Sequence, residues 1–305
     1  MKKKETFGSI ILFITALIWG CAFVAQKVGM DYIGPFTFCG VRFLFSALFL
    51  IMVVIIRDLF LYKKIQIFYM NKKDLKELLI GGTCCGIALA VATMLQQFSM
   101  QGTTAGKAGF TTALYIVLVP LFGLFIKKKV NTLEWISVGI ALISLVLLCF
   151  KKEELTNNLI ITGYDFGLLA CAICFSTQIL FIDHFSKKAD PIYLATIEFI
   201  VCAILGIIAM FIFEKPNIES INKALIPILY AGIASGGIAY TLQFIGQKHV
   251  NPVIASLIMS LEAVISLIAG AILIKERLTP QELLGCLLMF IAIIIPQIKF
   301  KKIFK

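Results

Sequence analysis

The sequence predicts an all-α membrane protein with ten transmembrane helices, arranged as two inverted five-helix repeats. Three observations support this fold class: hydrophobic residues make up 60% of the 305 positions, ten apolar runs are separated by short polar connections, and one pattern occurs twice along the chain. A water-soluble globule of this length cannot bury so much apolar surface. We therefore expect an integral membrane protein.

The repeat is visible as a gapless match between residues 107–129 and residues 254–276, a shift of 147 positions. Four identities fall in register: Leu114 on Leu261, Val117 on Val264, Gly123 on Gly270 and Lys128 on Lys275. A shift of 156 positions places Pro35 on Pro191 in the same way. Because the order and spacing of the apolar runs also repeat, we predict two related units, residues 1–152 and residues 153–305.

A spanning helix needs about 20 mostly apolar residues to cross a bilayer core of about 30 Å. The first run resembles a secretory signal, but it stays apolar for about twenty residues and no small-residue cleavage site follows, so it is predicted to span. The ten predicted helices lie near residues 8–29, 34–56, 77–100, 104–126, 132–150, 163–183, 190–213, 224–247, 250–274 and 280–298.

Lysine and arginine residues mark the orientation of these helices. With the N-terminus inside the cell, 19 of the 28 basic residues fall in cytoplasmic segments and six in external connections. The positive-inside rule therefore predicts that both termini are cytoplasmic. The basic residues sit in short connections rather than on one face, so the net charge of +11 reflects membrane orientation and no nucleic-acid partner is expected.

Five helices in each unit is an odd number, so the second unit must enter the membrane from the side opposite to the first. Inverted repeats of this kind are the architecture of carriers that expose a midplane site to each side in turn. The connection between the second and third helices is nine residues longer than its counterpart, and the basic segment 57–76 is expected to form an interfacial cytoplasmic loop there. The nine cysteines all lie within apolar runs, where a thiol behaves as a small hydrophobe, so no disulfide is expected.

Several short motifs resemble the EamA-like family of the drug/metabolite transporter superfamily. They are the segments ALIWG at 16–20, VRFL at 41–44, TTAGKAGF at 103–110, LYIVLVP at 114–120, ASLIMSLE at 255–262 and KERL at 275–278. The resemblance covers the whole chain. It implies ten helices, two EamA units and movement of small metabolites, commonly amino acids or related compounds and often outward. This chain departs from the family pattern at Ala263, where a proline usually follows the glutamate, and the departure removes the basis for expecting a kink there.

Glu262 lies at the middle of the ninth predicted helix, and its repeat counterpart is Tyr115 at the middle of the fourth. A charged side chain at the bilayer centre costs about 2.5–3.5 kcal/mol on insertion scales, so Glu262 needs a partner, a wet cavity or a function. We expect Tyr115 and Glu262 to face each other near the two-fold axis. Glu262 then acts as a ligand for a substrate amine or as a protonatable gate, or it forms a hydrogen bond between helices.

Arg42 and Glu198 are also repeat counterparts, each seven residues past its proline. They are expected about 10 Å inside opposite membrane faces, too far apart along the membrane normal for a direct salt bridge. Packing at the surface, with the charged ends reaching towards water, is the structural interpretation favoured for both. A functional role is the alternative that the sequence leaves open.

Amides and aromatic residues form the rest of the predicted substrate site. Uncharged donors and acceptors beside aromatic rings suit a neutral or zwitterionic cargo, whereas hydrogen bonding between helices, or core filling by Trp19, is the alternative. The complete set of predicted substrate-binding residues is Trp19, Gln96, Tyr115, Gln178, Tyr240, Gln243 and Glu262.

Together these features predict a permease of the cytoplasmic membrane that moves small organic metabolites, more often outward than inward, around a cavity lined by helices one, three, four, six, eight and nine. No GxxxxGK[ST] motif is present, so transport is facilitated or is driven by protons or another ion, with Glu262 and then Glu198 as coupling candidates. No cofactor or metal is expected, and the chain is a monomer or homodimer. The alternative is a membrane-embedded enzyme acting on lipid or prenyl substrates, which would need a carboxylate cluster or a His/Asp pair.

Overall fold

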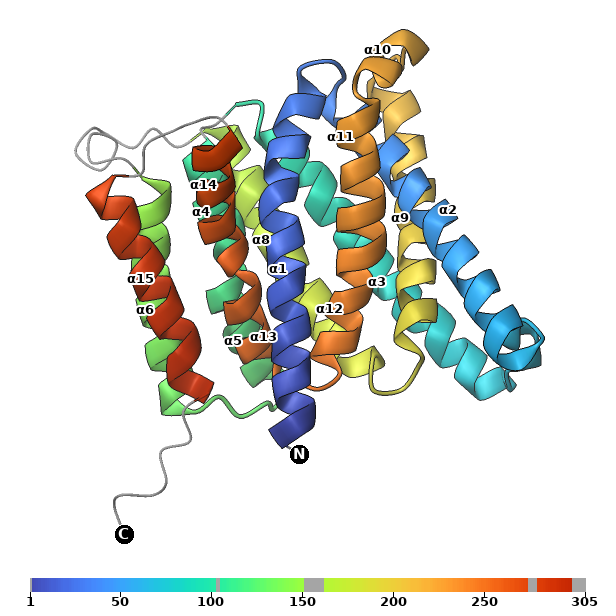
Figure 1. Cartoon of the computed structure of the whole chain (residues 1–305), viewed down its shortest axis with the longest axis horizontal. Helices are drawn as coiled ribbons and strands as arrows, with labels where there is room; N and C mark the ends of the chain where they lie inside the picture. The colour runs from blue at the N-terminus through green and yellow to red at the C-terminus, as the bar shows by residue number, and fades with distance from the viewer. Residues whose placement is uncertain (1, 103–104, 151–161, 274–278, 298–305) are drawn as a thin grey trace.

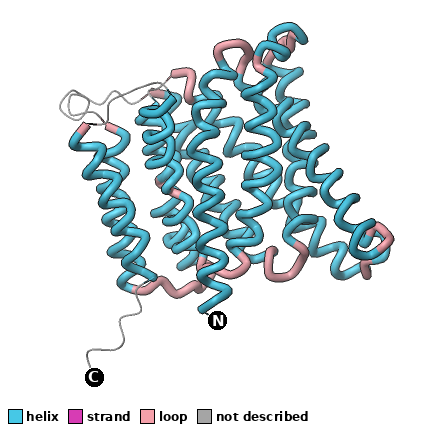
Figure 2. The backbone as a smooth tube through the Cα atoms, in the orientation of Figure 1, coloured by secondary structure: helices cyan, strands magenta, loops and turns pink. Residues whose placement is uncertain are grey.

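The computed structural model describes residues 2–102, 105–150, 162–273 and 279–297, and these residues form helices joined by short connections (Figure 2). The elements in chain order are α1 (Lys2–Met30), α2 (Pro35–Tyr62), η1 (Gln66–Tyr69), α3 (Lys72–Ser99), α4 (Ala105–Ala113), α5 (Tyr115–Phe125), α6 (Thr132–Cys149), α8 (Gly163–Phe185), α9 (Pro191–Phe213), α10 (Ile218–Lys223), α11 (Leu225–Leu229), η2 (Tyr230–Ala239), α12 (Tyr240–Gln247), α13 (Pro252–Met259), α14 (Leu261–Leu273), α15 (Pro280–Ile294) and η3 (Ile295–Gln297).

The predicted fold class is confirmed. Within the described residues, nine helical segments are long and apolar enough to cross a membrane, and the tenth, Pro280–Ile294, is a shorter apolar helix. Apolar side chains also cover the outside of the bundle; Phe125 is 85% exposed and Ile226 is 83% exposed. Such residues are stable on the outside of a bundle that is surrounded by lipid.

Helix starts follow local capping chemistry. Asn131 caps α6 in a capping box with Glu134, and Thr279 caps α15 in the same way with Glu282. The second, seventh, ninth and tenth predicted helices each have a proline in the first turn, where the missing N–H costs nothing. These signals place the predicted helix starts within a few residues of the observed ones.

The segment between the second and third predicted helices is more helical than expected. α2 continues to Tyr62 and α3 begins at Lys72, so both helices reach well into the segment 57–76. A short 3-10 turn, η1, occupies part of the remainder. The expected interfacial loop is therefore mostly an extension of two helices. Asp58 in this extension is buried, whereas Phe60 is 80% exposed.

Both described ends of the chain lie at one end of the bundle, where α1 begins and η3 ends (Figure 1). α6 ends and α8 begins at the opposite end (Figure 1). α6 packs beside α15 at one side of the bundle, and α2 packs beside α9 at the other. This arrangement agrees with an even number of crossings, while the cytoplasmic location of the termini stays a prediction.

Glu214, the residue that follows α9, closes the exposed start of α2. Its carboxylate accepts hydrogen bonds from the backbone N–H groups of Phe36 at 3.0 Å and Thr37 at 2.8 Å. Gly34, at the N-cap position, has no side chain that could do this. A carboxylate is favourable at a helix N-terminus, so Glu214 fastens the first half of the chain to the second at this end of the bundle.

The contact between α2 and α9 depends on two facing glycines. A methyl group added to Gly40 would lie 2.9 Å from the carbonyl oxygen of Gly206, and one added to Gly206 would lie 3.0 Å from the Cα of Gly40. Both clashes are with backbone atoms, which cannot move without separating the helices. The two helices therefore approach closely because neither carries a side chain at this point.

We predict that Gly40→Leu destabilises the protein by about 1–3 kcal/mol, the usual cost of overpacking. Gly139→Leu is the matched control, because Gly139 has no atom within 4 Å of an added methyl group. Reversible unfolding in bicelles measures both changes. Equal stabilities for the two variants would show that the α2–α9 contact does not have the described geometry.

Candidate functional site

The fourth and ninth predicted helices are each interrupted near the middle. The first break lies at Leu114 between α4 and α5, and the second lies at Ser260 between α13 and α14. With the repeat shift of 147 positions, the two breaks fall one residue apart. α4 and α14 lie towards one end of the bundle and α5 and α13 towards the other (Figure 1), as expected for inverted repeats.

Different residues accompany the two breaks. Pro120 lies inside α5 and provides no N–H for the carbonyl one turn earlier. In the second half, the hydroxyls of Ser256 and Ser260 donate to the backbone carbonyls three residues earlier, at 2.8 Å and 2.7 Å. Serine bonds of this kind compete with the helical ladder. The ninth helix is thus interrupted although Ala263 stands where the family pattern has proline.

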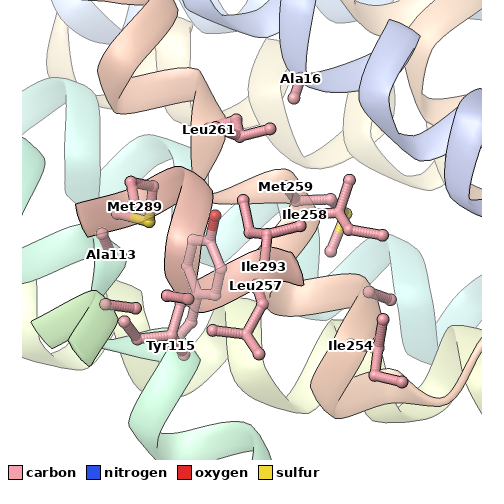
Figure 3. Packing of buried hydrophobic residues seen from close by; sticks show 14 of the residues in the cluster. Ala16, Ala113, Tyr115, Ile254, Leu257, Ile258, Met259, Leu261, Met289 and Ile293 are labelled. Atoms are coloured by element: carbon pink, nitrogen blue, oxygen red, sulfur yellow. The ribbon is translucent and has the colours of Figure 1, made fainter. Parts of the chain in front are cut away.

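The two breaks bring Tyr115 and Glu262 together. The Tyr115 hydroxyl donates to a carboxylate oxygen of Glu262 at 3.2 Å, which confirms the predicted meeting of these repeat counterparts. The ring of Tyr115 is buried in an apolar cluster that includes Leu257, Met259 and Met289 (Figure 3). The hydrogen bond therefore joins the two halves of the chain deep inside the bundle.

A small cavity of about 60 Å³ lies beside this hydrogen bond. All seven predicted substrate-binding residues line it, together with neighbours from the same helices; their role in binding stays a prediction. The polar and aromatic lining is Trp19, Phe23, Gln26, Arg42, Phe43, Thr93, Gln96, Thr112, Tyr115, Phe175, Gln178, Phe199, Ser235, Tyr240, Gln243 and Glu262. The lining includes the predicted helices one, three, four, six, eight and nine, and adds helices two and seven.

Side-chain contacts hold the cavity wall in place. The amide nitrogen of Gln178 donates to Glu198 at 2.9 Å and contacts the amide oxygen of Gln243 at 3.5 Å. Trp19 lies against Tyr240 with 4.7 Å between the ring centroids, and its indole N–H donates to the carbonyl of Ser235 at 3.4 Å. Residues of both halves therefore form one continuous polar and aromatic wall.

The positions of Arg42 and Glu198 contradict the favoured interpretation, in which both charged ends reach towards water at a membrane surface. Arg42 is only 5% exposed and Glu198 is fully buried, so neither side chain reaches towards a membrane surface. Arg42 lines the central cavity, and Glu198 contacts that lining through Gln178. The second predicted helix was not expected to line the cavity. The arginine inside its apolar run is the feature of the sequence that could have indicated this role. In agreement with the prediction, no ion pair within 4 Å joins these two residues in the described structure.

A second cavity, of about 340 Å³, lies next to the central one and shares Phe23, Gln96 and Glu262 with it. It extends along α1 as far as Lys27 and Asp31, which lie at the end of the bundle opposite the start of α1. We call this space the vestibule. Glu262 therefore stands between the central cavity and a wider space that leads towards one membrane face.

Ion pairs join the helices at the other end of the bundle. Asp183, at the end of α8, is paired with Lys128, which follows α5, and with Lys187 at 2.7 Å. Asp58 on α2 is held by Arg57 at 3.0 Å and accepts a hydrogen bond from Tyr193 on α9. Each cluster links an element of the first half to one of the second, so polar contacts join the halves at this end.

A bundle of membrane-spanning helices with a polar central cavity, a vestibule at one end and polar contacts between the halves at the other is the form of a membrane carrier. The EamA-like transporter family matches residues 6–150 and 162–296, which is nearly the whole chain. The chain belongs to the EamA-like transporter family, and it is a multi-pass membrane transporter.

Comparisons with individual proteins agree with this assignment. An uncharacterized transporter of Archaeoglobus fulgidus is 27% identical over 97% of this chain and 87% of its own length. The uncharacterized transporter YoaV of Bacillus subtilis is 25% identical, over 94% of this chain and 95% of its own length. A solved crystal structure superposes with a TM-score of 0.76 over 95% of this chain and 96% of that one; at 14% identity this likeness concerns the fold alone.

We predict a coupling energy of about 0.6 kcal/mol between Tyr115→Phe and Glu262→Met, the average for hydrogen bonds between transmembrane helices. A double-mutant cycle of unfolding free energies measures it. Tyr115→Phe combined with Tyr230→Phe is the control, since Tyr230 donates to the carbonyl of Ile18 instead. Additive effects in the first pair would show that the Tyr115–Glu262 hydrogen bond contributes nothing to stability.

Proposed function

We propose that this transporter is a carrier of small organic metabolites that works by alternating access around the central cavity. The observation that supports this most directly is the position of Glu262, which lines both the central cavity and the vestibule. A solute moving from the vestibule into the central cavity passes this carboxylate. We infer that the ion pairs between the halves close the route beyond the cavity, so a second arrangement of the two halves completes passage.

The size of the central cavity supports a cycle with more than one state. Its volume of about 60 Å³ is well below the roughly 300–1,000 Å³ of pockets that hold small molecules. A metabolite does not fit until the helices around the cavity separate. We infer that the structure is a substrate-free state with the vestibule accessible and that the vestibule faces the outside of the cell when both termini are cytoplasmic.

The lining supports a neutral or zwitterionic cargo, such as an amino acid or a related compound, in the cytoplasmic membrane. Amide groups, hydroxyls and aromatic faces are the groups that orient such solutes in mostly apolar pockets. We propose export as the direction of transport, with Glu262 as the first candidate for proton or ion coupling and Glu198 as the second. A ligand that raises the melting temperature and is recovered unchanged would distinguish a carrier from an enzyme.

We predict that Glu262→Gln abolishes transport or uncouples it from a pH gradient. Glutamine keeps an acceptor oxygen for Tyr115 but removes the charge and the exchangeable proton, so the melting temperature should change little. The cargo is first found by melting-temperature shifts with amino acids, nucleosides, vitamins and cationic drugs, and its flux is then measured in proteoliposomes.

Glu219→Gln is the matched control, because Glu219 lies on the surface in a pair with Lys223. If the Glu262→Gln protein transports the cargo at the wild-type rate and with the wild-type pH dependence, Glu262 has no role in the mechanism.

We predict that Asp183→Asn lowers the share of molecules with an accessible vestibule, because Asp183 holds the opposite end closed. Asp183 itself is buried, but its lysine partners are partly exposed to solvent, so we take up to about 1 kcal/mol for the ion pair, which changes the ratio of the two states about fivefold. The probe is Ser266→Cys in a protein that carries Cys149→Ala, because both residues line the vestibule, and it is labelled with a membrane-impermeant maleimide in intact cells. Labelling should slow about fivefold at most when Asp183→Asn is added.

Glu219→Gln again provides the control, and its labelling rate should equal that of the Ser266→Cys protein alone. An unchanged rate in the Asp183→Asn protein would contradict a role for this ion pair in selecting the state.

A further inference from the structure

We propose that Arg42 binds a carboxylate of the transported solute and is the anion-binding subsite of the central cavity. The proposal rests on the carrier function given above and adds the chemical class of the cargo: an organic acid whose carboxylate faces α2. Arg42 reaches this position from a helix that the sequence did not assign to the cavity.

Arg42 has no acidic partner in the described structure. It is 5% exposed, its Nε atom has no hydrogen-bond partner, and no carboxylate lies within 4 Å of its guanidinium among the described residues. Its contacts are the rings of Phe38 and Phe43, at 5.6 Å and 5.0 Å from the guanidinium carbon, and the thiol of Cys39. None of these groups carries a negative charge.

Arg57, on the same helix, provides a comparison, because its guanidinium has carboxylate partners. Its guanidinium is paired with Asp58 at 3.0 Å and with Asp190 at 2.9 Å, and it also lies over the ring of Tyr193. Arg57 is the more exposed of the two arginines and has two carboxylate partners, whereas Arg42 is buried and has none. A buried charge needs a partner more than an exposed one does. If burial alone decided the pairing, Arg42 rather than Arg57 would have the carboxylate partners.

A guanidinium keeps its positive charge in proteins, so it cannot escape this cost by becoming neutral. The cation–π contacts with the two phenylalanine rings stabilise the charge in part. An anion that entered the cavity would provide the missing counter-charge. The planar fork of arginine matches a carboxylate with two parallel hydrogen bonds, which a ring contact does not replace.

The rest of the cavity favours an organic carboxylate over an inorganic anion. Trp19, Tyr240 and Phe199 supply aromatic surface for an apolar body, and a bare ion would leave this surface unused. Glu262 lines the same cavity from α14 and would repel a second negative charge. The arrangement therefore fits a solute with one carboxylate at the Arg42 wall and a neutral or cationic group at the Glu262 wall.

The experiment compares matched ligands on the whole protein in nanodiscs. The probes are the twenty common L-amino acids, each tested with its α-amide and its decarboxylated amine, and the readout is the shift in melting temperature. Wild-type protein should be stabilised by at least one acid and not by the amide or amine of that acid. Arg42→Gln should weaken binding of the acid about tenfold or more, the effect of losing a charge-assisted hydrogen bond, and Arg42→Lys should weaken it less.

Three results would overturn the proposal: an amide or amine that binds as well as its acid, acid binding retained by Arg42→Gln, or no response of the wild-type protein to any acid. If Arg42→Gln does not fold, the comparison of acid with amide on the wild-type protein decides alone. Flux of an amine or a nucleoside in proteoliposomes, without any effect of acids, would leave the carrier function standing and remove only the role of Arg42.

Discussion

The hydrogen bond between Tyr115 and Glu262 is the contact on which the rest of the site depends. Both residues follow a break in a central helix, and each comes from a different half of the chain. Polar groups at this depth have no bulk water to bind, so they must be satisfied by each other or by a wet cavity. Glu262 uses both solutions, because one of its oxygens accepts from Tyr115 while its side chain also lines the central cavity and the vestibule.

The remaining features of the site follow from this meeting of the two halves. Gln178 and Gln243 continue the polar wall away from the hydrogen bond, and Trp19 packs on Tyr240 beside it. Contacts between the halves differ at the two ends of the bundle. Glu214 fastens α2 at one end, and the ion pairs Lys128–Asp183 and Arg57–Asp190 fasten the other. A carrier needs contacts of this kind, since they can be broken and remade without unfolding a helix.

Hydrophobic runs and the internal repeat predicted the ten helices and the pairing of Tyr115 with Glu262, because lipid and symmetry restrict both strongly. The predicted cavity residues also line one cavity, although their role in binding and the unit boundary near residue 152 stay predictions. The break at Ser260 was not predicted, since it arises from side-chain hydroxyls rather than from proline. The position of Arg42 was missed because helix tilt and packing, which periodicity does not encode, decide whether a side chain near a helix end faces a surface or a cavity.

Inverted repeats require that the two halves cross the membrane in opposite directions. The most direct test places reactive tags after residue 156, in the connection between the halves, and at residues 2 and 305, and labels each from outside intact cells. If the halves are inverted and both termini are cytoplasmic, the central tag is labelled at once, whereas both terminal tags react only after the membrane is permeabilised. A central tag on the same side as the N-terminal tag would contradict inverted repeats, and with them the shared site.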